Sequence, residues 1–482
     1  MELLTLAVSL LLIALTFFLL RRSSGGVDAL PPGSFGWPLL GESVEFLFGK
    51  PEKFVGDRMK KYSLDIFKTK ILGEKTAVIC GPAGHKFLFS NEQKYFTAFR
   101  PHPMQHLFRS YKPKSASAAE KPAEAAAPPT TKATDETKAI RQPGFLKPEA
   151  LMRFLAGMDL ITQKQLQIHC AGKNVVQFYP LSKTITLTIA CQFFMGINNP
   201  ERIARLVKNF DDVTVGMHCI MLNLPGTIFY RGNKAAAALR KELIAVIKEK
   251  KQSIAGGAPL HDILSHMIVA SDPAGRSMPE PEIADKIMGI LTAGYSTVAT
   301  TMTFLMKYLG LNPDIYERVR AEQLEIAAVK KEGEPLNWED MGKMKYSWNV
   351  ICETMRMVPP LQGTFREVLE EFTYAGYNIP KGWKVYWTVS TTNMNPQYFK
   401  NPERFNPSRY EEGEAPPPYT YVPFGGGPRM CPGKEYARIS ILAFVHNVVK
   451  NYRWEVVDPN EKVEGDMMPE PQKGLPVRLY KQ

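Results

Sequence analysis

The chain has 482 residues, a formal net charge of +12 and six cysteines. This length excludes a minimal domain. The cysteines show no paired or metal-type spacing, which excludes a disulfide framework and predicts a reducing, cytosol-facing compartment. Because the basic residues are dispersed and no recognised binding fold accompanies them, we do not expect nucleic acid as a partner.

The first segment is a nearly continuous apolar run from Leu3 to Leu20, which is just long enough to span a bilayer. Two arginines follow it directly and no Lys or Arg precedes it, so the positive-inside rule keeps the rest of the chain in the cytosol. A cleaved secretory signal, the alternative, would carry positive charge before the run. We therefore expect a membrane anchor over 1–22, a stiff proline-rich hinge over 23–38 and one folded catalytic domain over 39–482.

Residues 39–100 mix short strand-like runs, such as Thr76–Cys80, with turns, and predict a small β-portion. His102 and His106 are four residues apart, a spacing that suits a metal on a helix. The prolines at 101 and 103 disfavour a helix here, so we interpret the stretch as a loop over a substrate pocket.

Residues 112–138 are rich in Ala, Pro, Lys and Glu and contain no aromatic residue, which predicts a flexible, solvated loop. From Leu151 onward helical periodicities dominate, for example over 235–250 and 314–330. Farther along, Glu353 and Arg356 lie three residues apart in a helical segment and share one face. Alone, such a pair is most often a solvated surface bridge.

The most informative motif is the glycine-rich loop Phe424–Gly433, which presents Cys431 just ahead of a helical pattern that begins at Lys434. Its glycines allow a tight turn beside a flat macrocycle. A thiolate is stabilised at a helix N-terminus, and as an axial haem ligand it favours O–O cleavage over oxygen carriage. Arg429 is placed to pair with an anionic haem propionate. The alternative is a chance glycine loop with a buried structural cysteine.

This loop resembles the haem-binding pattern of the cytochrome P-450 superfamily, Phe-x-x-Gly-x-Arg-x-Cys-x-Gly, with Phe424, Gly427, Arg429, Cys431 and Gly433 at its five fixed positions. The resemblance implies a mainly α fold, with a large helical domain, a small β-portion and an N-terminal transmembrane helix. It also implies haem b ligated through its iron by Cys431. Electrons would come from NADPH through a separate cytochrome P-450 reductase, since nothing in the chain resembles a flavin or nicotinamide site.

The same resemblance assigns roles to residues 290–300, which match the helix over the haem iron. Gly294 would open this helix for dioxygen, and the Thr297 hydroxyl would hydrogen-bond the distal oxygen and relay protons. Ser296 stands where the family usually has an acid, and a serine passes a proton but cannot store one at neutral pH. The alternative is a buried helix whose threonines hydrogen-bond their own backbone.

Two sets of charged residues also gain roles from the resemblance. Glu353 and Arg356 would form a structural triad with Arg409, whereas Arg404 lies one repeat too early to serve. The residues implied around the haem propionates are Arg141, Arg366 and Arg429. Arg141 is the best candidate in its segment, although the Pro-Gly pair that follows shortens the helix beyond it.

Longer phrases, among them Lys345–Val350 and Tyr377–Lys384, resemble the plant triterpenoid oxidases of the β-amyrin 28-oxidase group. This likeness implies an endoplasmic reticulum enzyme, in contact with membrane lipid, that oxidises a cyclic triterpenoid or related apolar terpenoid. It does not give the carbon attacked or the number of successive oxidations. The segments that face the haem pocket in the family contribute residues that could equally be core: Phe99, Met104, Leu107, Ile290, Tyr295, Leu361, Phe365 and Leu475.

Two rival functions stay open at this point. A haem-thiolate hydroperoxide isomerase or dehydratase needs neither dioxygen nor NADPH; Ser296 favours it, whereas Thr297 and the ordinary Cys431 loop argue against it. A non-catalytic haem-binding protein is the second rival, favoured by the long 112–138 segment. Dependence on oxygen and NADPH separates the first rival from a monooxygenase, and turnover of a terpenoid excludes the second.

Overall fold

The computed structural model describes residues 30–482 except 39, 109–145, 272–274, 412, 414 and 466. The predicted anchor, part of the predicted hinge, the 112–138 segment and Arg141 therefore lie outside the described residues. Across the ranges that are described, no helix combines the length and the apolar character needed to cross a bilayer.

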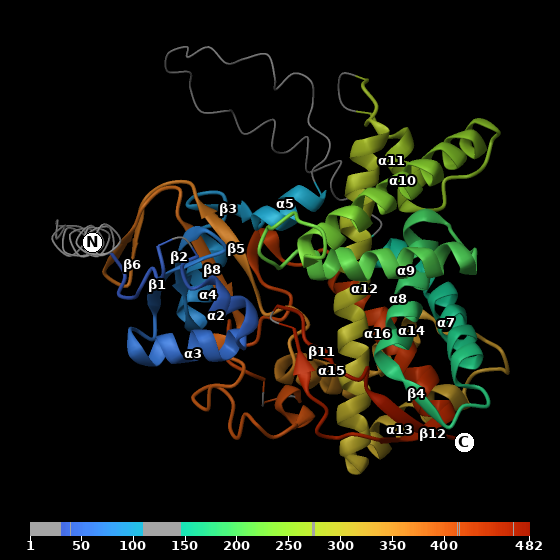
Figure 1. Ribbon diagram of the computed structural model, residues 1–482. Coiled ribbons are helices and arrows are strands. Elements are labelled where there is room, and N and C mark those ends of the chain that lie inside the picture. The colour runs from blue at the N-terminus through green and yellow to red at the C-terminus, as the bar shows by residue number, and fades with distance from the viewer. Residues whose placement is uncertain are drawn as a thin grey trace, which may run out of the picture.

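The described chain has a sheet-rich part, on the left in Figure 1, and a larger helical part on the right. The prediction of a mainly α-helical fold with a small β-portion is confirmed. The α-helices are α2 (Ser43–Phe48), α3 (Pro51–Lys61), α4 (Gly81–Ser90), α5 (His102–Phe108), α7 (Pro148–Cys170), α8 (Phe178–Met195), α9 (Pro200–Gly216), α10 (Ile228–Ala255), α11 (Ile263–Val269), α12 (Glu280–Leu311), α13 (Pro313–Ala328), α14 (Trp338–Lys343), α15 (Lys345–Met357) and α16 (Lys434–Asn451). Short 3₁₀ helices are η3 (Val389–Thr391), η4 (Pro407–Tyr410) and η5 (Gly427–Arg429).

The main sheet has five strands in the order β1-β2-β8-β5-β3, in which only the β2–β8 pair is parallel. A second sheet joins β4, β12 and β9, and two hairpins pair β6 with β7 and β10 with β11. The strands are β1 (Ile66–Ile71), β2 (Glu74–Ile79), β3 (Phe96–Phe99), β4 (Val175–Gln177), β5 (Gly363–Val368), β6 (Phe372–Tyr374), β7 (Tyr377–Ile379), β8 (Lys384–Thr388), β9 (Tyr452–Val456), β10 (Val463–Glu464), β11 (Glu470–Pro471) and β12 (Pro476–Lys481).

The long helix α12 runs vertically through the helical part in Figure 1. It begins with a proline in its first turn and two glutamates that complement the helix dipole. Most of its side chains are buried, because α8, α10, α15 and α16 pack around it. A helix that is apolar nearly all round forms the centre of a large core.

The structure corrects the interpretation of residues 101–108 as a loop. His102–Phe108 forms α5, because prolines at and just before the first turn lie where no intrahelical N–H bond is required. The His102 Nε2 atom lies 2.8 Å from Glu74 Oε1 on β2, and the His106 ring packs against Phe229 on α10. The two histidines therefore face different neighbours.

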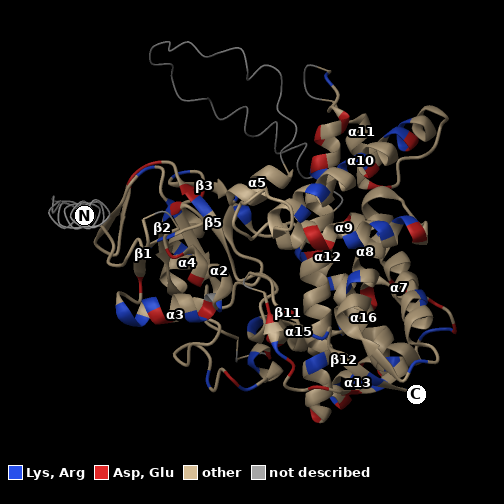
Figure 2. Cartoon of the chain, in the orientation of Figure 1, with Lys and Arg blue, Asp and Glu red and all other residues tan. Residues whose placement is uncertain are grey.

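Charged side chains of both signs are interspersed over the two parts of the molecule (Figure 2). Helix α3 is an example, with Glu52 in its first turn and Arg58, Lys60 and Lys61 in its last turn, as the helix dipole favours. The positive net charge is thus spread over many elements.

Candidate active site

Cys431 is the exposed cysteine of this chain, whereas the other five are buried. Its backbone N–H donates a hydrogen bond to the Phe424 carbonyl at 2.9 Å, which closes the loop between η5 and α16. Gly433 precedes the first residue of α16, and a Cβ at this position would lie 3.8 Å from the Cys431 Sγ atom. The loop therefore presents the sulfur beside the N-terminus of α16.

Two effects act on the pKa of the Cys431 thiol. Although the residue is exposed on its outer side, the surrounding protein desolvates the sulfur and raises the pKa, while a hydrogen bond from the Gly433 backbone N–H lowers it. Desolvation is the larger effect, so the helix N-terminus alone does not offset it. A metal cation at the sulfur would supply the missing stabilisation of the thiolate.

Gly425 and Gly427 in the loop are favoured for different structural reasons. Gly425 and Gly427 adopt positive φ angles of 69° and 64°. A Cβ at Gly427 would collide with the carbonyl oxygen of Phe89 on α4, whereas a Cβ at Gly425 would make an ordinary 3.5 Å contact with Trp387. The end of α4 thus lies directly against the loop, and only glycine fits at Gly427.

This difference gives a matched pair of substitutions. We expect Gly425→Ala to cost about 1–2 kcal/mol from its left-handed backbone alone. Gly427→Ala adds the clash with Phe89, so we expect roughly 1–3 kcal/mol more and a lower haem-to-protein ratio. Thermal unfolding and haem content check both variants. Equal stabilities for the two would contradict the close contact with α4.

Arg366 and Arg429 meet at the buried carboxylate of Glu92, which lies between α4 and β3. Arg366 forms an ion pair with Glu92 Oε1 and donates hydrogen bonds to Thr364 Oγ1 (3.0 Å) and to the Phe365 carbonyl (3.1 Å). Arg429 is exposed, and its Nε lies 3.9 Å from Glu92 Oε2. Two of the three predicted propionate arginines therefore lie together, while Arg141 is outside the described residues.

Helix α12 has one strip of residues that are not fully buried. Ala293 is exposed, and Ile290, Gly294 and Thr297 are half-buried, whereas most other residues of this part of α12 are buried. The Thr297 hydroxyl donates to the Ala293 carbonyl at 2.9 Å, as the backbone-bonding alternative predicts. It lies on this strip, where it can exchange this bond for one to a ligand.

Ser296 and Tyr295 lie on the buried side of the same helix. The Ser296 hydroxyl has no hydrogen-bond partner within the described part of the chain, and Tyr295 donates to Asp211 on α9 at 2.6 Å. Burial together with Asp211 raises the pKa of Tyr295 well above its usual value. The structure therefore separates these two residues from Thr297. Gly294 leaves α12 continuous, and a Cβ there would lie 3.3 Å from the Phe194 ring and 3.7 Å from Tyr436 on α16.

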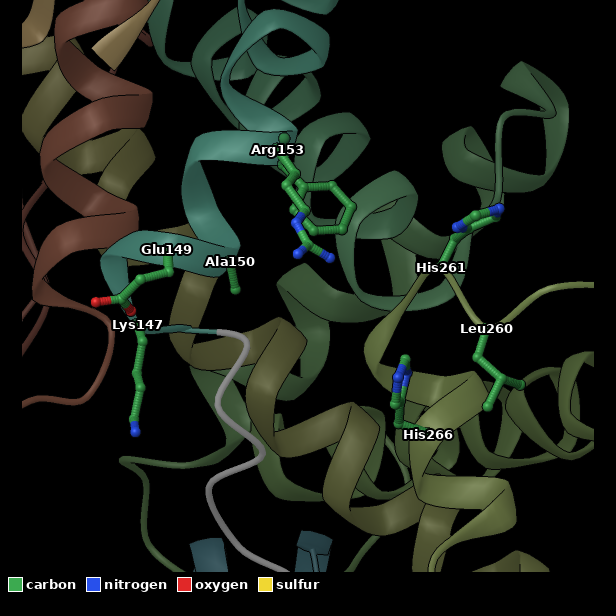
Figure 3. Close-up of a pocket in the computed structure, with 8 residues that line it drawn as sticks. Lys147, Glu149, Ala150, Arg153, Leu260, His261 and His266 are labelled. Carbon is green, nitrogen blue, oxygen red and sulfur yellow. The ribbon is translucent and has the colours of Figure 1, made fainter. Parts of the chain in front are cut away.

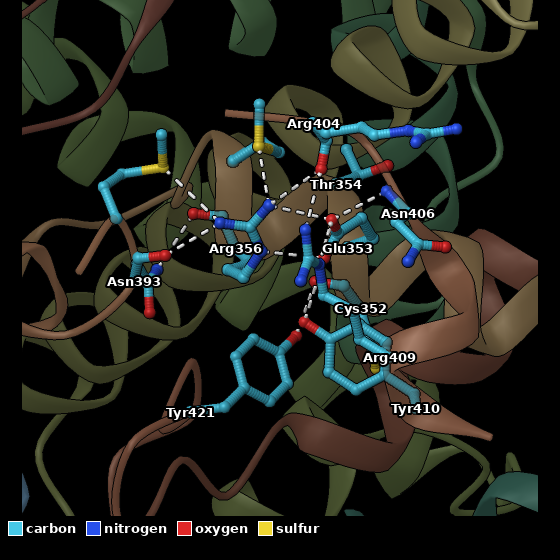
Figure 4. Close-up of polar contacts among 12 residues, drawn as sticks. Cys352, Glu353, Thr354, Arg356, Asn393, Arg404, Asn406, Arg409, Tyr410 and Tyr421 are labelled. Atoms are coloured by element: carbon cyan, nitrogen blue, oxygen red, sulfur yellow. Dashed lines mark hydrogen bonds and ion pairs between the residues drawn. The ribbon is translucent and has the colours of Figure 1, made fainter. Parts of the chain in front are cut away.

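Glu353, Arg356 and Arg409 form one buried network (Figure 4). Both Glu353 oxygens accept hydrogen bonds from Arg356 at 2.8 Å, and the Arg409 Nε lies 3.2 Å from Glu353 Oε1. The Asn406 backbone N–H and the Tyr410 hydroxyl also donate to this carboxylate. Arg404 takes part through its backbone carbonyl, which accepts from Arg356 and Arg409. The network ties α15 to the segment that leads into the cysteine loop.

The predicted pocket residues fall into two groups. Phe99, Leu361 and Phe365 share a cluster on the sheet side, whereas Leu107, Tyr295 and Leu475 belong to the helical core, with Met104 and Ile290 packed against it. The Leu475 backbone carbonyl also accepts a hydrogen bond from Phe178 at the start of α8.

A cavity of about 570 Å³ opens elsewhere, between the start of α7 and the segment before and within α11 (Figure 3). Its lining residues include Lys147, Arg153, His261 and His266, and none of the predicted pocket residues. Lys147 lies just after the 109–145 range that the structure leaves out, so the cavity carries no assignment.

Sequence reasoning missed Glu92 and Met467. Met467 lies at the tip of the β10–β11 hairpin, where its carbonyl accepts a hydrogen bond from the Gln362 backbone N–H at 3.1 Å and its side chain joins the cluster of Phe365. A turn-type glycine at 465 is a weak signal for this hairpin. Glu92 has no motif around it, and only the fold reveals its position between two arginines.

Comparison with known proteins places these features in a family. A family model described as Cytochrome P450 matches residues 31–477. The chain belongs to the cytochrome P450 family. Among solved structures, this P450 is similar to the retinoic acid-bound cyanobacterial CYP120A1, with a TM-score of 0.81 and 31% identity over 95% of this chain and 100% of that chain.

Curated relatives from plants are closer in sequence. The β-amyrin 28-monooxygenase of Medicago truncatula is 47% identical over 98% of both chains. The β-amyrin 28-monooxygenase CYP716A378 of Saponaria officinalis is 48% identical over 96% of this chain and 94% of its own. This P450 is thus a monooxygenase that uses a haem-thiolate cofactor and receives electrons from a reductase.

The residues described around Cys431 fit such a cofactor. The one exposed thiol lies at a helix N-terminus, and a Cβ at the neighbouring Gly433 would lie 3.8 Å from its sulfur. Two guanidinium groups face a single carboxylate beside the loop, which leaves one positive charge for anionic propionates. The buried indole N–H of Trp387, next to Gly425, also has no partner within the described residues.

Proposed function

We propose that this P450 oxidises β-amyrin or a closely similar cyclic triterpene at the carbon that gives its relatives their name, carbon 28. The supporting observation is the 47–48% identity to two enzymes named β-amyrin 28-monooxygenase over nearly the whole chain. The partly buried apolar side chains of Phe99 and Leu361 pack against a cluster that includes Phe365 and Met467, and apolar groups of this kind suit a substrate with few polar groups.

Within this proposal Cys431 is the axial ligand of a haem b, and Arg366 and Arg429 hold its propionates, with Arg141 as a third candidate. Bound in this way, the haem supplies the iron that activates dioxygen. Ala293 and Thr297 border the space where oxygen and substrate meet, and Thr297 holds a proton there through its hydroxyl. Glu353, Arg356 and Arg409 hold the segment before the cysteine loop in place.

The proposed setting is the endoplasmic reticulum membrane, with residues 1–22 as a single-pass anchor, 23–38 as the hinge and 39–482 as a cytosolic catalytic domain. Electrons come from NADPH through NADPH–cytochrome P450 reductase. Contact with lipid is supported by a run of large, exposed apolar side chains in the connection between α9 and α10: Ile220, Met221, Leu222 and Leu224.

Products from microsomes that hold this chain and a plant reductase test the proposal. We expect β-amyrin to gain one oxygen atom, or to reach the acid, only when NADPH is present, and α-amyrin, lupeol and dammarenediol to react less. A thiolate-type carbon monoxide spectrum without any product from these four substrates would refute the triterpene assignment.

Thr297→Ala tests the proton-relay role separately. We expect this variant to keep the thiolate-type spectrum but to divert electrons to hydrogen peroxide, lowering product per NADPH by on the order of tenfold or more. Thr301→Ala is the matched control, because the Thr301 hydroxyl also donates to its own helix, to the Thr297 carbonyl at 3.0 Å, but is buried. Unchanged coupling in Thr297→Ala would remove the relay assignment.

A further inference from the structure

Glu92 is a buried acid at the meeting point of three segments. It follows α4, and its carboxylate has no exposed surface. Arg366 reaches it from β5 and Arg429 from η5 of the cysteine loop. These segments are far apart in the sequence, so the carboxylate joins the sheet-rich part to the haem-binding loop.

The two arginines use Glu92 unequally. Arg366 pairs closely with Oε1 and has two further acceptors, whereas the only ion pair that Arg429 makes with a described residue is the 3.9 Å approach to Oε2. Glu92 Oε2 is buried and has no hydrogen-bond partner within the described chain. A buried carboxylate oxygen without a hydrogen-bond donor is energetically costly, so the position of Glu92 needs an explanation other than packing.

The end of α4 also supports the loop through its backbone. The Phe89 carbonyl lies against Gly427, two residues before Arg429, and the Phe89 ring lies against Gly426. Glu92 is three residues farther along the same segment. The backbone contact of Phe89 and the ion pair of Glu92 with Arg429 therefore act on the same loop.

We infer that Glu92 is a positioning residue for the haem, whose carboxylate orients the guanidinium groups of Arg366 and Arg429 toward the propionates. The inference rests on the propionate roles proposed above. With Glu92 ionised, its negative charge and the two positive guanidinium groups together carry one net positive charge, and the carboxylate holds both groups in a fixed arrangement. With a glutamine in its place, two unpaired guanidinium groups repel each other and lose that arrangement.

The test compares Glu92→Gln with Glu367→Gln in the haem-loaded protein. Glu367 is the matched control, because it neighbours Arg366 on β5 but has a side chain that is 42% exposed, and it pairs with Lys384 at 3.4 Å. We expect Glu92→Gln to transfer haem to apomyoglobin about tenfold faster, as outer-shell changes typically do, and Glu367→Gln to match the wild type. Loss of a nearby negative charge should also move the midpoint potential of the haem iron to more positive values. A general loss of stability would speed haem transfer without that shift.

A double-mutant cycle with Arg429→Gln shows through which residue Glu92 acts. We expect Glu92→Gln to add less than about twofold to haem transfer when Arg429→Gln is already present, because the two residues form one unit. Multiplicative effects, or an unchanged rate and potential in Glu92→Gln, would overturn the inference. Wild-type retention of haem by Arg429→Gln would instead refute the propionate role on which the inference rests.

Discussion

Cys431→Ser is expected to abolish the thiolate-type carbon monoxide spectrum and all NADPH-dependent oxidation. The hydroxyl that replaces the thiol remains protonated at neutral pH and is a poor donor to iron, so the electron release that favours O–O cleavage is lost. The substitution changes one atom at an exposed position in a loop held by the Phe424–Cys431 backbone bond, so we expect the fold to persist.

Cys219→Ser is the matched control for this experiment. Cys219 is buried, and its thiol donates to the Gly216 carbonyl, a bond that a serine hydroxyl can keep. We expect this variant to retain the spectrum and the activity. A normal thiolate-type spectrum in Cys431→Ser would mean that another cysteine binds the iron.

Glu353→Gln is expected to have the second large effect, a loss of about 3–5 kcal/mol in the free energy of unfolding together with loss of haem-loaded protein. Glu353 and Arg356 have fully buried side chains, and Arg409 shares the same carboxylate. Without the negative charge, two guanidinium groups remain unpaired in the interior. The denaturation midpoint followed by far-UV circular dichroism, and the haem content, measure the effect.

Glu317→Gln provides the comparison, because Glu317 pairs with Arg453 at an exposed position. Such a pair contributes at most about 1 kcal/mol, so this variant should unfold almost as the wild type does. Similar denaturation midpoints for Glu353→Gln and Glu317→Gln would contradict the claim that the buried network supports the segment before the cysteine loop.

The parts of the site that the sequence predicts best are local in the chain. The residues of Phe424–Gly433 are contiguous, and the three-residue spacing of Glu353 and Arg356 fixes their common helix face whatever else the fold does. Arg409 required the family resemblance, because nothing in its own segment shows that it reaches α15.

The rest of the site depends on contacts between distant segments. Glu92 lies 274 residues from Arg366, and no periodicity or spacing connects them. The helix at His102–Phe108 was obscured by its prolines, which disfavour a helix interior but are tolerated at its start. Leu475 comes from a segment that faces the pocket in the family, and the structure shows its side chain buried in the helical core just before β12. Side-chain direction of this kind is set by tertiary packing.

Turnover of β-amyrin under oxygen-18 gas tests the central claim most directly. The proposed function predicts that the product carries one heavy oxygen atom for each hydroxylation and that none forms without NADPH. A product that lacks the label, or that forms without NADPH, would contradict the claim that this P450 inserts oxygen from dioxygen into a triterpene. It would favour an isomerase or dehydratase instead.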